Sequence, residues 1–184
     1  MKAFTLLETA LSISILIFIF FSLFFLVINV SNLSSFSLLH TGTEGKALLN
    51  LKIMEKELKS METSNLGGYP IEEASSTKIV FYSDIDNDNL IEKISYSLIE
   101  DKLEKKVIKP TGNPLTYNEN FAQISYVLDN LITPQKLFSF YDNNFEETND
   151  ISKIRLIKID IKINQGRKIF SSYLFVAPRN LKDK

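Results

Sequence analysis

A charge-free run near the amino terminus constrains this chain more than any other feature of its sequence. Between Glu8 and Glu44 there is no Asp, Glu, Lys or Arg, and the part that ends at Val30, ALSISILIFIFFSLFFLVINV, has no Gly or Pro either. At 1.5 Å per residue this part would be about 30 Å long as a helix, which matches the hydrocarbon thickness of a bilayer. The run therefore predicts a transmembrane helix over residues 4–30.

The charges that flank the run predict its orientation. Lys2 lies on the short amino-terminal side, and acidic residues are common beyond residue 43. The positive-inside rule then places the amino terminus in the cytoplasm. The sequence thus predicts a single-pass protein of the cytoplasmic (inner) membrane, with its carboxy-terminal domain outside the cytoplasm.

Glu8 lies at the start of the apolar run, where a carboxylate needs an explanation. Thr5 and Glu8 fit the S/T-x-x-E capping box, and an acid also suits the positive end of the helix dipole. A cleaved secretory signal is disfavoured, because its apolar stretch would be only roughly 7 to 15 residues long. A plain signal anchor would account for the run but not for Glu8. Considered alone, Glu8 is best interpreted as a helix cap.

Composition limits the classes of function. A chain of 184 residues has room for one exported domain besides the helix. A net charge of −1 argues against nucleic-acid binding, and the lack of Cys excludes disulfides and zinc-thiolate sites. The sequence has no Gly-rich phosphate loop, nucleophile elbow or paired-carboxylate motif. We therefore expect no enzyme and no required cofactor.

The order Ala-Phe-Thr-Leu-Leu-Glu, followed at once by the apolar run, resembles the amino-terminal signature of type IV pilins and pseudopilins. The resemblance implies that a prepilin peptidase cleaves between Ala3 and Phe4, which makes residues 1–3 a leader peptide, and that Phe4 is N-methylated. It also implies that Glu8 pairs with the amino-terminal ammonium of a neighbouring subunit during assembly. A lone carboxylate suits this role, because a mismatched register would leave its charge unpaired in an apolar bundle.

The implied function is that of a structural minor pilin or pseudopilin, which helps to initiate or tip a pilus, a type II secretion pseudopilus or a DNA-uptake filament. The implied partners are other pilin or pseudopilin subunits, the prepilin peptidase, the inner-membrane assembly platform and the lipid bilayer. Two departures are evident: Ala3 stands where the family most often has Gly, and no Pro interrupts the apolar run. The alternative is a single-span, membrane-anchored extracytoplasmic binding module, which would have no use for Glu8.

Residues 31–62 are predicted to continue the helix. From Glu44 onward, apolar residues recur at spacings of four and three, which gives one narrow stripe with Lys and Glu around it. This stripe, which is expected to pack on the domain's own sheet, consists of Ala47, Leu51, Met54, Leu58 and Met61. Gly67, Gly68 and Pro70 then disfavour further helix.

Residues 63–184 are predicted to form an antiparallel sheet domain. The pattern changes to a period of two, and strands are expected at TKIVFYS, EKISYSLI, KLFSFYD, IRLIKIDIKI and KIFSSYLFV. In the fourth of these, one face carries Ile157, Ile159, Ile161 and Ile163. DNDN, IEDK and NQGR mark turns. The predicted fold class is therefore α+β and pilin-like, with a long amino-terminal helix, transmembrane in its first half and amphipathic in its second, packed on the sheet.

Several segments of this domain are similar to those of the J-type minor pseudopilins and related minor pilins. They are IVFYSDIDNDNLIEKISYSL, LFSFYDNN, IKIDIKI and VAPRNL. In that subgroup an acidic strand-turn-strand, a Tyr-Asp pair and a terminal Arg-Asn occur in this order. In this comparison, the retention of Glu8 implies a subunit that docks beneath another one, because the terminal subunit of the tip often lacks this residue.

The segment DIDNDNLIE is a candidate metal site. Its carboxylates, at every second or fourth position as at the start of a calcium loop, are Asp84, Asp86, Asp88 and Glu92. An EF-hand would need Gly in place of Asn89 and Glu in place of Ser95, so that motif is absent. The preferred interpretation is a solvated hairpin turn rich in Asp and Asn, and the alternative is a calcium-binding turn.

Overall fold

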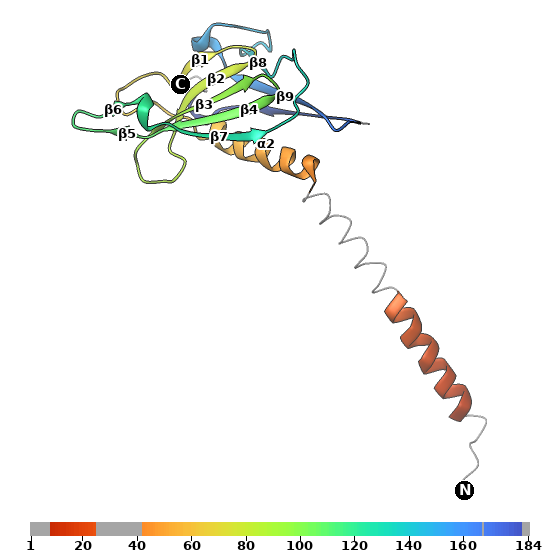
Figure 1. The fold of residues 1–184 in the computed structure, drawn as a ribbon. Coiled ribbons are helices and arrows are strands. Elements are labelled where there is room, and N and C mark those ends of the chain that lie inside the picture. Colours follow the sequence, from red (N-terminus) through yellow and green to blue (C-terminus); the bar gives the residue numbers. More distant parts are fainter. Residues whose placement is uncertain (1–7, 25–41, 167, 182–184) are drawn as a thin grey trace. The chain divides into compact units, whose positions relative to one another are not determined.

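The computed structural model of this chain describes residues 8–24, 42–166 and 168–181 (Figure 1). Its contacts divide the chain into two compact units, Met1–Gly45 and Lys46–Lys184. The predicted cleavage site at Ala3 and Phe4 lies outside the described residues.

Residues 8–24 form a helix that is about 25 Å long at 1.5 Å per residue. Ser12 and Ser14 do not interrupt it, because their hydroxyls bond to carbonyls one turn earlier. Ser12 Oγ donates to the Glu8 carbonyl at 2.8 Å, and Ser14 Oγ donates to the Ala10 carbonyl at 2.9 Å. These two hydroxyls are thus satisfied within the helix.

The prediction of a pilin-like α+β fold with one long amino-terminal helix is wrong. The described residues contain two short helices, residues 8–24 and α2 (Thr43–Lys59). In this described part, neither helix combines the length and the apolar character needed to cross a bilayer. The physical reason is that α2 has a start of its own: it begins directly after Gly42 and carries the acidic Glu44 in its first turn. Its Lys and Glu residues also separate it in character from the apolar run.

The apolar stripe of α2 is confirmed as its packing face. All of its members are buried, namely Ala47, Leu51, Met54, Leu58 and Met61. The helix itself ends at Lys59, and Met61 makes an isolated antiparallel bridge with Ser83. The stripe therefore continues from the helix directly into contact with strand β2 (Lys78–Ser83).

Ten strands follow α2 in the described part of the chain. They are β1 (Ile71–Ala74), β2 (Lys78–Ser83), β3 (Glu92–Ile99), β4 (Lys102–Ile108), β5 (Pro110–Thr111), β6 (Thr116–Tyr117), β7 (Gln123–Leu128), β8 (Phe138–Tyr141), β9 (Leu156–Asn164) and β10 (Ile169–Val176). They form a five-stranded sheet in the order β1-β2-β3-β4-β7, a three-stranded sheet β10-β9-β8 and a small pair β5-β6. All neighbouring strands are antiparallel. Three short 3-10 helices complete the domain: η1 (Glu119–Phe121), η2 (Ile151–Lys153) and η3 (Arg179–Leu181).

The five predicted strands correspond to β2, β3, β8, β9 and β10, but they lie in two sheets instead of one. β7 was not predicted, and the mixed charges of the segment EDKLEKKVIK, which contains β4, indicate a solvated strand face but not the strand with which it pairs. The KLEKKVI segment of β4 mixes Lys and Glu with apolar residues, and β7 is an edge strand whose first four residues are all exposed. Neither strand therefore shows a clean alternation of apolar and polar residues.

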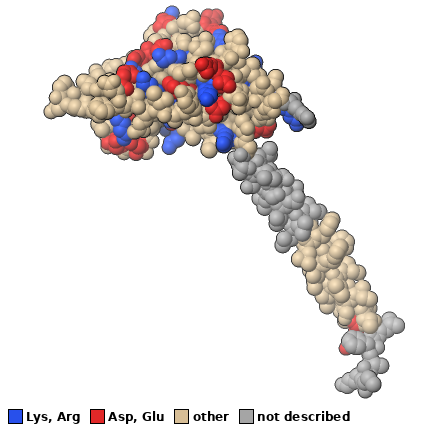
Figure 2. All heavy atoms as spheres, viewed as in Figure 1, with Lys and Arg blue, Asp and Glu red and all other residues tan. Residues whose placement is uncertain are grey.

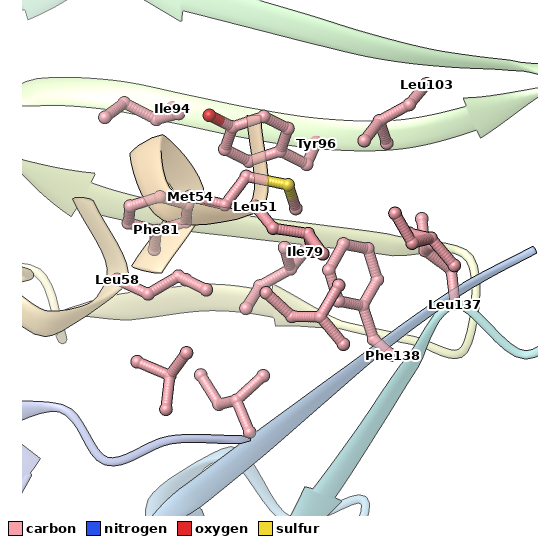
Figure 3. Packing of buried hydrophobic residues seen from close by; sticks show 14 of the residues in the cluster. Leu51, Met54, Leu58, Ile79, Phe81, Ile94, Tyr96, Leu103, Leu137 and Phe138 are labelled. Atoms are coloured by element: carbon pink, nitrogen blue, oxygen red, sulfur yellow. The ribbon is translucent and has the colours of Figure 1, made fainter. Parts of the chain in front are cut away.

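One core joins α2 to both larger sheets (Figure 3). Leu51 and Met54 of α2 belong to the same buried cluster as Phe138 of β8. The rings of Phe81 and Tyr96 stack with centroids 6.3 Å apart. The predicted isoleucine face of β9 is confirmed, because Ile157, Ile159, Ile161 and Ile163 are all fully buried. Burying each side chain of this size stabilises the fold by about 1.5–3 kcal/mol.

This core also fixes the β2–β3 hairpin. The two strands pair from Lys78↔Ser97 to Ser83↔Glu92, and their inward residues Ile79, Phe81 and Ile94 are fully buried. The loop between Ser83 and Glu92, which contains the acidic segment, is therefore held at both ends by buried strands.

Candidate functional site

Glu8 is the first described residue of the helical segment 8–24. Both interpretations of Glu8, as a cap and as a docking group, stay predictions. Its predicted capping partner Thr5 lies outside the described residues.

The side chains of helix 8–24 are exposed on every side. The large apolar ones are Leu11, Ile13, Ile15, Leu16, Ile17, Phe18, Ile19, Phe20, Phe21, Leu23 and Phe24. Figure 2 shows charged side chains of both signs over the domain, whereas the described helix shows them only at its acidic end. A helix that is apolar all round has no polar face to turn towards water. It needs an apolar environment, either lipid or other helices.

The acidic loop is organised by Asp84. One of its carboxylate oxygens accepts a hydrogen bond from the Asn87 N–H at 2.6 Å, and the other accepts one from the Asn89 N–H at 3.1 Å. Both asparagines have a positive φ, of 60° and 66°. Asn tolerates this left-handed conformation better than most residues. The loop sequence therefore closes the hairpin around one carboxylate.

Three of the four predicted metal ligands converge. Asp84, Asp86 and Asp88 each offer a carboxylate oxygen, and these oxygens all lie within 4.8 Å of one another. Oxygens that share one calcium ion lie at 2.3–2.6 Å from it, so two of them are separated by no more than about 5 Å. The spacing is thus compatible with a single ion, although clustered carboxylates on a surface are not by themselves a metal site.

Lys109, which follows β4, reaches into this cluster. Its ammonium hydrogen-bonds with Asp86, lies 3.2 Å from Asp88 Oδ2 and lies 3.6 Å from Glu92 Oε1. The carboxylates of Asp86 and Asp88 raise the pKa of Lys109, and the pKa of Asp88 is lowered by the Leu90 N–H and by Lys109. The ammonium of Lys109 is therefore shared by the carboxylates of Asp86, Asp88 and Glu92.

The sequence interpretation missed Lys109, although a signal was present. β3 and β4 pair with Lys93 opposite Ile108. Glu92 directly precedes the first of these residues and Lys109 directly follows the second, so antiparallel pairing places them across from each other. Predicting the pairing of β4 with β3 would have found the contact.

Glu92, the fourth predicted ligand, differs from the aspartates because its side chain is fully buried. Its Oε2 accepts a hydrogen bond from the Ile85 N–H at 3.0 Å, while Oε1 is buried without a hydrogen-bond partner. Burial, with a further contribution from the charge of Asp86, raises the pKa of Glu92. A buried carboxylate oxygen that is only loosely paired with an ammonium at 3.6 Å is energetically expensive.

Apart from the acidic loop, a concave region lies on the outer face of the five-stranded sheet. Its lining includes Glu72, Lys93, Lys106 and Glu119. Lys93 pairs with Glu72 at 2.7 Å, and Lys106 forms an ion pair with Glu119. Because its cations and anions pair with one another, this region does not favour a ligand of either charge.

Comparisons with known proteins do not assign this chain to a family. No protein-family model matches it, and no curated protein matches it significantly. The resemblance to type IV pilins therefore rests on the sequence itself, on the amino-terminal motif, the apolar run and the segments similar to J-type minor pseudopilins.

Proposed function

We propose that this chain is a structural subunit of a type IV filament system, a minor pilin or pseudopilin that helps to initiate or tip a pilus, a secretion pseudopilus or a DNA-uptake filament. The observation that carries the proposal is the helical segment of residues 8–24, which contains Glu8 and exposes apolar side chains in every direction. The proposal concerns assembly through this helix and does not require a pilin-like fold for the rest of the chain.

The argument for assembly begins with the apolar surface. Phe18 and Phe20 are 77% and 67% exposed, and aromatic rings left in water at this density favour association. Lipid would cover the helix before assembly, and neighbouring helices would cover it in a filament. We place the protein in the cytoplasmic (inner) membrane, anchored by the apolar run that extends in sequence to Val30 with its amino terminus inside.

The second part of the argument is the charge of Glu8. A carboxylate at the edge of an apolar bundle is costly unless a cation meets it. The ammonium created at Phe4 by cleavage after Ala3 would supply that cation on a neighbouring subunit. Such a pair fixes register, because a shifted helix would leave both charges unpaired.

The alternative, a membrane-anchored extracytoplasmic binding module, is supported by the size of the folded unit Lys46–Lys184. It makes a different prediction for Glu8, which an anchor does not need. Processing between Ala3 and Phe4 also separates the two functions, because a plain anchor keeps its amino terminus.

Two substitutions of Glu8 test the proposal. Glu8→Gln retains a polar side chain that can cap the helix but removes the charge, whereas Glu8→Leu removes both. Co-purification of each variant with its partner subunits from detergent-solubilised membranes is the measurement, with equal membrane levels as the control. We expect both variants to lose their partners. Loss in the Leu variant alone would indicate capping only, and retention by both would contradict docking through Glu8.

Mass spectrometry of the same membrane extracts tests processing. We expect a mature terminus at N-methylated Phe4, and retention of Met1, Lys2 and Ala3 in cells without the peptidase. An unprocessed chain in cells that contain an active prepilin peptidase would contradict the proposed function.

A further inference from the structure

We propose that one face of α2 lies on a membrane surface that contains anionic lipids. This outer face, on the side of the helix opposite its buried stripe, consists of Lys46, Leu49, Lys52, Ile53 and Lys56. The inference rests on the proposed placement of the apolar run in the membrane, and it does not require filament assembly.

The members of the outer face form one continuous stripe. They recur at spacings of three and four residues, which places them on the same side of a helix, and all of them are exposed. Leu51, Met54 and Leu58 of the buried stripe point into the core on the other side (Figure 3). The described part of the chain therefore leaves this second side of α2 open to solvent.

Two members of the outer face are large apolar residues. Leu49 is 60% exposed and Ile53 is 40% exposed, and Leu48 beside them is exposed as well. A helix face that only meets water would carry polar side chains at these positions. In a helix that lies along a membrane surface, such side chains enter the headgroup region, which removes their apolar area from water.

The other three members of the outer face are lysines, and the acidic residues of α2 are engaged elsewhere. Glu55 pairs with Lys59 at 2.5 Å, Glu57 is buried against the five-stranded sheet, and Glu44 lies half-buried in the first turn. No acidic residue of α2 is thus among its exposed residues. The outer face carries positive charge only.

This charge favours a lipid surface over a second copy of the same face. Two such faces would bring lysines against lysines, which is unfavourable. Anionic headgroups attract each lysine that lies within a Debye length of them. The lysine stems can also lie along apolar surface while their ammonium groups stay with the lipid phosphates.

The position of α2 in the chain supports the same occupant. Residues 31–42 separate the end of the apolar run from the start of α2. A segment of this length spans about 40 Å at most. With the apolar run in the membrane, α2 is tethered near the headgroups, and a tether lets a weak attraction suffice because the effective concentration is high.

The test uses the full chain reconstituted in vesicles of phosphatidylcholine alone or of phosphatidylcholine mixed with phosphatidylglycerol. Because the chain has no Cys, Leu49→Cys provides a unique site for an environment-sensitive fluorophore. Flotation with the vesicles reports anchoring, and quenching by a nitroxide-labelled lipid reports contact of the outer face with the bilayer. Phe145→Cys, at an apolar residue that is 75% exposed in a turn after β8, is the matched control site.

We expect strong quenching at position 49 in anionic vesicles, and little in phosphatidylcholine vesicles or at position 145. Raising the salt concentration from about 0.1 M to about 1 M shortens the Debye length from about 10 Å to about 3 Å and should reduce the quenching.

A triple substitution tests the charge of the outer face. Lys46→Gln, Lys52→Gln and Lys56→Gln together should lower the ratio of membrane-bound to free α2 about fivefold for each lysine removed. The same three positions changed to Arg keep the charge and should preserve the quenching.

Four outcomes would overturn the inference. Equal quenching in both kinds of vesicle, or at both labelled positions, would show that anionic lipid does not select this face. A blue-shifted emission without quenching would indicate that protein, such as a second copy of this chain, covers it. No change at position 49 in a chain that floats with anionic vesicles would show that the face stays in water. A chain that floats with neither kind of vesicle would also contradict the membrane placement on which the proposed function depends.

Discussion

The hydroxyl of Tyr96 on β3 donates a 2.7 Å hydrogen bond to the carboxylate of Glu57 on α2. The other oxygen of that carboxylate accepts from Lys105 on β4 at 2.5 Å. Tyr96 is 1% exposed and Glu57 is 7% exposed, so the three side chains form a buried polar contact between the helix and the five-stranded sheet. This contact fixes the register of α2, because a shift of one residue would leave a buried carboxylate without partners.

Replacing Tyr96 with Phe should destabilise the domain. The ring would stay packed against Phe81, but one buried oxygen of Glu57 would lose its donor, at a cost of about 1–3 kcal/mol. The expected decrease in Tm is about 2–4 °C per kcal/mol for a domain of this size. Thermal unfolding followed by tyrosine circular dichroism measures it. Tyr126→Phe, on the exposed strand β7, is the matched control and should change the Tm little. A Tm decrease that is equal in both variants would contradict the role of the buried contact.

Alkaline pH should destabilise the domain through the same residue. Burial first, and then the charge and hydrogen bond of Glu57, raise the pKa of Tyr96 above its ordinary value near 10. The folded state therefore holds this proton more tightly than the unfolded chain does. Its stabilising contribution is complete below pH 10 and is lost as the pH rises towards the folded-state pKa. Urea unfolding between pH 8 and pH 11 should show this loss, and Tyr96→Phe should weaken the pH dependence. Tyr82 and Tyr117, whose pKa values are also raised, should preserve part of it.

The carboxy-terminal segment should contribute to stability through Leu181. This residue is 4% exposed in the core cluster, and the neighbouring Asn180 donates a hydrogen bond to the Met61 carbonyl at 3.0 Å. Leu181→Ala should cost about 2 kcal/mol, the lower end for such a truncation, because Leu181 lies in a short 3-10 helix that can relax into the space. Leu66→Ala, at a residue that is 59% exposed, is the control for equilibrium unfolding. If Leu181→Ala and Leu66→Ala have equal free energies of unfolding, the carboxy-terminal segment does not hold the end of α2.

The local patterns of the sequence predicted individual elements well. The stripe of α2 and the isoleucine face of β9 are buried because periods of about 3.6 and 2 place apolar residues on one side of a helix or strand. The turns were also predictable, since Asn87, Asn89 and Gly166 adopt the positive φ values that such residues tolerate. These features depend on residues that are close in the chain.

The features that the sequence did not predict depend on contacts between distant residues. Glu57 and Lys105 look like solvent-facing charges on their own elements, and only the packing of α2 on β4 shows that they pair in the interior. The separation into two sheets and the placement of Lys109 beside Glu92 are likewise set by strand pairing. The spacing of apolar residues along the chain gives the period of each strand, but it does not tell which strand lies beside it in the sheet. The prediction of one continuous amino-terminal helix has a different origin. The apolar run and the stripe of α2 are both helical patterns, and they follow each other in the sequence.

Glu92→Gln should stabilise the domain. Burial raises the pKa of Glu92, so the ionised form is disfavoured in the folded state. Because its folded-state pKa lies above the unfolded value, the carboxyl destabilises the folded state as the pH rises through and beyond that range. Gln can still accept the hydrogen bond from Ile85 without carrying a charge, and we expect a gain on the order of 1 kcal/mol at neutral pH, or about 2–4 °C in Tm.

Thermal unfolding of the wild type and Glu92→Gln at neutral pH gives the two Tm values. A variant that is less stable than the wild type would indicate that the Lys109 ammonium, 3.6 Å from Glu92 Oε1, already compensates the buried charge.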